Sequence, residues 1–181
     1  MINLIDSITE WLDKTVCAKL KFKAPARGGR EGAGYEYKLV KPQAFPCFCP
    51  PQDGTNLPTT PSVTVQIDGF TEELTAESEV KIALVFAIWN PGLHDNRGFT
   101  PKFEKNLDGW RDLWRFIDAT RLAIKKNFNV MGFEVIGDIA GRPLAGDSAI
   151  MGTYPFFFGE VTFTIGTISS SGTSAAIRHL L

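Results

Sequence analysis

At residues 80–89 the chain reads VKIALVFAIW, and Lys81 is the only charged residue in this stretch. A continuous apolar run that is rich in β-branched and aromatic side chains is typical of a central strand. Such a strand is buried on both faces by the rest of its own chain, or it is covered on one face by a partner subunit. Pro91 and Gly92 follow almost directly and end the strand. Residues 80–89 therefore predict the middle of a sheet.

Further strands are predicted on both sides of this run. Residues 62–68 alternate apolar with polar side chains and end at an Asp68-Gly69 turn signal, as a half-buried strand does. Residues 133–139 and 159–168 are rich in β-branched residues and predict two more strands. Because consecutive strands are joined by short connections, the pattern favours a mainly antiparallel sheet.

Two amphipathic helices are predicted at residues 2–18 and 108–128, because apolar residues recur in each at steps of three and four. The first stripe consists of Ile2, Ile5, Ile8, Leu12 and Val16, widened by Leu4 and Trp11. The second consists of Trp110, Leu113, Trp114, Ile117, Ile124 and Phe128. We expect both stripes, tryptophans included, to face the sheet. Asp112 with Arg115 and Asp118 with Arg121 are expected to pair on the outer side of the second helix.

Together these elements predict an α+β fold, with a mainly antiparallel sheet of four to five strands and two helices packed on one face. With 181 residues, a single domain spanning 1–181 is expected. Proline and glycine interrupt residues 24–61, where only 35–40 and 44–49 favour short strands, so we expect an irregular arm that carries contacts. The serine- and glycine-rich tail at 169–181 is expected to be flexible.

Composition and charge argue against several classes of binding partner. Nineteen basic and twenty acidic residues leave a net charge of −1, so neither a broad phosphate-binding surface nor sequence-specific binding of nucleic acid is expected. The basic residues between Lys19 and Arg30 are interpreted as a solvated strand end and loop. No stretch is long and apolar enough to cross a membrane, and the chain opens on an amphipathic pattern without a secretory signal. We expect use in a cytoplasm or within a particle.

Residues that could carry chemistry are few and scattered. Cys17, Cys47 and Cys49 are an odd number, so no disulfide framework is expected, and the closely spaced pair lacks the further ligands that zinc needs. His94 beside Asp95 could form a base and its orienting acid, but no nucleophile accompanies them. The sequence has neither a glycine-rich phosphate loop nor a Gly-x-Ser-x-Gly elbow. We therefore predict no catalytic, cofactor or metal site, and a protein that is not an enzyme.

Five segments carry a resemblance: a helix at 2–16, PSVTVQI at 61–67, an acidic connector into 80–89, a helix at 108–128 and EVTFTI at 160–165. In this order the chain resembles the tail terminator, or tail completion, proteins of long-tailed bacteriophages and related prophage particles. The resemblance implies a protomer that closes into a ring, typically a hexamer, on the end of the tail tube. Such a ring stops tube growth and offers a surface to the head–tail connector. It also implies a place in the virion tail after assembly in a bacterial cytoplasm.

The contacts of such a ring are assigned to loops, because the segments 24–61, 90–107 and 140–158 are rich in glycine and proline and carry aromatic residues. The interface residues predicted there are Phe99, Phe103, Phe156, Phe157, Phe158, Arg27, Arg30 and Arg97. The expected partners are further copies of the chain, the tail tube protein and the head–tail connector protein. Two alternatives stay open: a head–tail connector or minor tail component, and a small hydrolase or ligand-binding domain.

Overall fold

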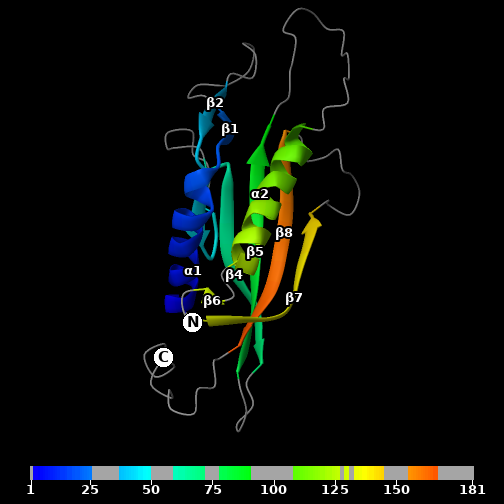
Figure 1. The fold of residues 1–181 in the computed structure, drawn as a ribbon. Coiled ribbons are helices and arrows are strands. Elements are labelled where there is room, and N and C mark those ends of the chain that lie inside the picture. Colours follow the sequence, from blue (N-terminus) through cyan, green and yellow to red (C-terminus); the bar gives the residue numbers. More distant parts are fainter. Residues whose placement is uncertain are drawn as a thin grey trace, which may run out of the picture.

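Strand β5, Glu79–Trp89, runs through the interior of a six-stranded sheet with the order β3-β4-β5-β8-β7-β6 (Figure 1). Its neighbours β4, Ser62–Thr71, and β8, Phe156–Gly166, are both antiparallel to it. The apolar run at 80–89 is thus confirmed as a central strand. The computed structural model describes residues 2–25, 37–49, 59–71, 78–90, 108–126, 129–130, 133–144 and 155–166.

The remaining strands complete this sheet and form a small second one. β7, Phe133–Pro143, is antiparallel to β8, and the two-residue β6, Asn129–Val130, pairs with its start. At the opposite edge β3, Gln43–Pro46, joins β4 in the one parallel pairing among the described strands. β1, Phe22–Pro25, and β2, Tyr37–Val40, form a separate antiparallel ribbon. The predicted α+β class with a mainly antiparallel sheet is confirmed, and the short β3 and β6 bring the main sheet to six strands.

Both long helices lie on the same face of the main sheet, as predicted (Figure 1). α1, Ile2–Thr15, packs on β3 and β4 and is followed by the 3-10 turn η1, Cys17–Lys19. α2, Asp108–Lys126, packs on β5, β7 and β8. The helical layer therefore spans the sheet from its β3 edge to β7.

The core lies between this helical layer and the sheet. Val65, Leu84 and Val161 form one row across β4, β5 and β8, and each is at most 1% exposed. Phe116 of α2 packs edge-on against Phe86 of β5, with 4.8 Å between ring centroids. Along β8 the buried positions alternate with half-buried ones, so the two faces of the strand have different environments.

Two glycines allow α2 to approach the sheet closely. A Cβ atom at Gly109, in the first turn of α2, would lie 2.0 Å from Phe157 Cε2. A Cβ atom at Gly159 of β8 would lie 2.8 Å from Ile117 Cδ1. A methyl group fits at neither position unless the neighbouring side chains move, because protein interiors are closely packed. These contacts set the height and rotation of α2 on the sheet.

The buried stripe of α2 differs from the predicted one. It is formed by Gly109, Leu113, Phe116, Ile117, Thr120 and Ile124. Trp110 is half-buried and Trp114 is 41% exposed, so the prediction that both tryptophans face the sheet is wrong for Trp114. Successive residues of an α-helix point about 100° apart, and Trp114 therefore points sideways when Leu113 faces the sheet. In α1, Ile2 was likewise predicted to be buried and is 75% exposed.

Candidate protein interface

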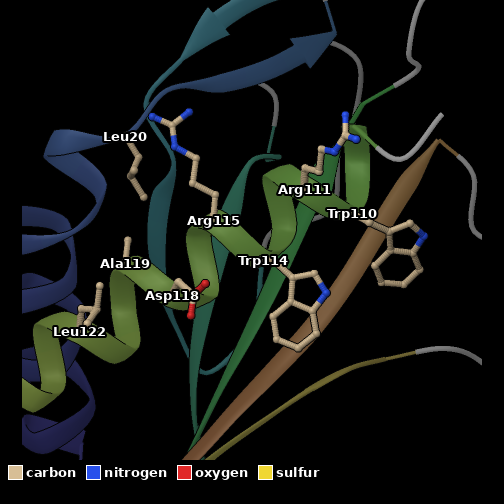
Figure 2. A pocket seen from close by; sticks show the side chains of 8 residues that line it. All are labelled: Leu20, Trp110, Arg111, Trp114, Arg115, Asp118, Ala119 and Leu122. Carbon is tan, nitrogen blue, oxygen red and sulfur yellow. The ribbon is translucent and has the colours of Figure 1, made fainter.

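An open groove runs along the outer side of α2. It consists of two adjoining hollows, of about 720 Å³ and 380 Å³, which share Leu20, Ala119 and Leu122. In the first hollow the indoles of Trp110 and Trp114 extend from one side of the helix, and two arginine side chains extend from the other (Figure 2). We call the two hollows together the α2 groove.

The floor of the α2 groove is apolar and reaches solvent. Trp114 and Leu122 are 41% and 57% exposed. Trp110 is half-buried, and its indole packs edge-on against Phe157 at 5.4 Å. Leu20, which follows η1, is buried and closes the groove on the side of α1. Exposed apolar side chains gathered in this way mark surfaces that contact other proteins, and aromatic residues are enriched there.

The rim of the α2 groove is mainly cationic. Its lining includes the basic side chains Lys19, Arg111, Arg115 and Lys126. Asp118, the carboxylate among the lining residues, forms the predicted pair with Arg121 at 3.2 Å. Arg111 is paired with Asp108 at 3.1 Å, and both side chains are well exposed, so this pair contributes little to stability. The groove thus combines an apolar centre with a positive border.

Two half-buried aromatic side chains lie on the sheet face away from the helices. Phe156 is in register with Trp89 and Phe158 with Ala87. The rings of Phe156 and Phe158 are half-buried and stack with centroids 6.4 Å apart. Phe157 points the other way, is 7% exposed and packs beneath α2, because adjacent residues in a strand face opposite sides. Phe156 and Phe158 stay interface candidates, whereas Phe157 belongs to the core and its predicted interface role is not carried forward.

A polar cluster joins the β1–β2 ribbon to the end of β5 and to α2. Asn90 donates from Nδ2 to Asp112 Oδ2 at 2.7 Å, and its Oδ1 accepts from Lys23 Nζ at 3.3 Å. The same ammonium group lies 4.8 Å from the ring centroid of Tyr37. Burial raises the pKa of Asp112, against the hydrogen bond from Asn90 and the charges of Lys23 and Arg115. The prediction that Asp112 pairs with Arg115 on the outer side is therefore wrong, since its carboxylate is half-buried in this cluster.

The other predicted interface residues, Phe99, Phe103, Arg27, Arg30 and Arg97, lie outside the described residues, as do His94 and Asp95. Cys47 is exposed, and the half-buried Cys49 donates from Sγ to Thr59 O at 3.6 Å. Within the described parts of the chain, no three His, Cys, Asp or Glu side chains are grouped as ligands of a metal ion would be. Neither described helix combines the length and apolar character needed to span a bilayer.

The α2 groove was not predicted from the sequence, although one signal for it was present. Leu122 lies nine positions after Leu113, about half a turn around the helix axis, so it is an apolar residue on the polar side of an amphipathic helix. No protein family model matches the chain, and no curated protein matches it. Functional inference therefore depends on these surfaces and on the order of the elements.

Proposed function

We propose that this chain is a structural subunit of a phage or prophage tail, in which copies of it form a ring that caps the tail tube. The ring would stop tube growth and join the tube to the head–tail connector. The observation that carries the proposal is that the chain presents two unlike surfaces with exposed apolar side chains in different parts of its fold. One is the α2 groove, with Trp114 and Leu122, and the other is the end of β4, where Phe70 is 59% exposed.

Two unlike surfaces favour one type of assembly over another. A single self-complementary patch produces a two-fold dimer, whereas a patch that fits a different patch on the next copy produces head-to-tail contacts. Such contacts close into a ring when the rotation between copies is suitable. Growth then ends at the ring, because its exposed face no longer matches the next tube subunit. The resemblance of the element order to tail terminators favours six copies and a position at the end of the tube.

Light scattering coupled to size exclusion, followed by negative-stain imaging, tests this proposal. The chain alone is expected to give a single species several times the protomer mass, with ring-shaped projections. Added to a polymerising tail tube protein from the same genome, it should shorten the tubes and appear as a cap at one end. Monomers in both experiments, with tube lengths unchanged by increasing amounts of the chain, would refute the proposal.

A further inference from the structure

The β4–β5 pair projects beyond both helices at the end where Thr71 pairs with Glu79 (Figure 1). We call this end, residues 69–71 and 79–81, the ribbon tip. At the tip, Phe70 is 59% exposed and Glu79 is exposed. In the sequence, residues 72–79 contain four glutamates and neither lysine nor arginine. The tip therefore joins an exposed aromatic side chain to an acidic segment.

We propose that the ribbon tip of one copy docks into the α2 groove of a second copy. The inference rests on the proposed ring and names the contact that joins its neighbouring subunits. Phe70 supplies an apolar anchor for the exposed floor around Trp114 and Leu122. Glu79 supplies negative charge for the cationic rim of the groove, because the charge of Lys81 at the tip is balanced by its ion pair with Asp68 at 2.6 Å. Charge complementarity of this kind selects partners and orientation, whereas a groove placed against a groove would bring like charges together.

The edges of the main sheet favour a side-chain contact over strand addition. At β3, the outward N–H of Ala44 already donates to Asp13 Oδ1 of α1 at 2.9 Å, and Pro46 has no N–H to offer. At β7, the pairing is irregular around Gly137, and the exposed Asp138 adds charge to the edge. Both devices discourage pairing with another strand. Copies are thus expected to meet through the tip and the groove.

Sedimentation velocity of the full chain over a concentration series tests the contact. Lys126→Glu reverses one charge in the groove lining, and Lys125→Glu makes the same change in the same last turn of α2, outside that lining. Because both changes oppose the helix dipole equally, they form a matched pair. We expect self-association about ten-fold weaker for Lys126→Glu and within about two-fold of wild type for Lys125→Glu. Thermal unfolding by circular dichroism verifies that each variant is folded.

Mixing two variants tests whether tip and groove are the actual partners. Glu79→Lys at the tip should weaken association about as much as Lys126→Glu does. In an equimolar mixture, the reversed tip of one variant meets the reversed groove of the other, and the unchanged tip meets the unchanged groove. Both contacts are then complementary, so association should return to near the wild-type level. Two alternating variants can close any ring with an even number of subunits.

The outcomes separate this contact from the proposed function. Equal effects of Lys126→Glu and Lys125→Glu, or a mixture that associates as poorly as its components, would overturn docking of the tip in the groove while leaving a wild-type ring intact. A wild-type chain that stays monomeric at all concentrations and with tail tubes would overturn the ring and the contact together. Weaker self-association of Lys126→Glu but not of Lys125→Glu, together with recovered association in the mixture of Lys126→Glu and Glu79→Lys, would establish the contact.

Discussion

Gly109→Ala should destabilise the protein, although alanine is the better helix former. The new Cβ would lie 2.0 Å from Phe157 Cε2 and 2.4 Å from two further atoms of that ring. The ring is 7% exposed and packs against Trp110, so it cannot simply swing away. Overpacking of this kind costs about 1–3 kcal/mol, whereas helix propensity contributes at most about 1 kcal/mol in return. A contact as short as 2.0 Å places the cost in the upper part of its range, so we expect a net loss of about 1–2 kcal/mol, or roughly 2–8 °C in Tm for a chain of this length.

Urea unfolding followed by circular dichroism measures this loss. Gly69→Ala is the matched control, because a Cβ there would meet nothing within 4 Å. The control should be neutral or stabilise the fold by less than about 1 kcal/mol. In a double-mutant cycle, Phe157→Leu should reduce the cost of Gly109→Ala, since the smaller side chain leaves room for the methyl group. A Gly109→Ala protein as stable as the wild type would refute the reasoning from close packing.

Three further predictions concern single groups. Because burial raises the pKa of Asp112, the folded chain holds its proton more tightly than the unfolded chain, and stability should fall as pH rises from the unfolded to the folded pKa. Across this pH window, the urea midpoint of unfolding should fall less for Asp112→Asn than for the wild type. If the midpoints of both proteins changed equally with pH, the buried carboxyl group of Asp112 would not be the cause. Cys47 is exposed and should react with a thiol reagent in the native protein. Burial raises the pKa of Cys17 to about 12, so native Cys17 should react only after unfolding, and rapid native labelling would contradict this. Asp13→Ala removes the acceptor for the Ala44 N–H and should lower the free energy of unfolding by about 1 kcal/mol. Asp13→Asn keeps an oxygen acceptor and should lower it less. An unchanged urea midpoint for Asp13→Ala would count against this hydrogen bond.

The strands that could be predicted are those whose signal is local. The apolar run at 80–89 and the alternation at 62–68 specify burial without reference to any partner, and both became strands of the main sheet. The β1–β2 ribbon shows where such reasoning ends. Lys21-Phe22-Lys23-Ala24 alternates weakly, but its pairing with 37–40 across a glycine-rich segment depends on contacts distant in sequence. The sequence of a short extended segment predicts its conformation more readily than it predicts the strand with which the segment pairs.

The position of the proposed interface was harder to predict, because an apolar residue on a helix can belong either to the core or to an exposed binding surface. Trp110 and Trp114 extend the same periodic stripe that buries Leu113 and Ile117, and the sequence alone favours burial for all four. The rotation of α2 decides between core and surface, and that rotation is set where Gly109 meets the ring of Phe157. The close contact that anchors the helix therefore also turns Trp114 toward solvent. A substitution that lifts the start of α2 should change the shape of the α2 groove as well as the stability of the fold, so core packing and the proposed assembly surface are coupled through one glycine.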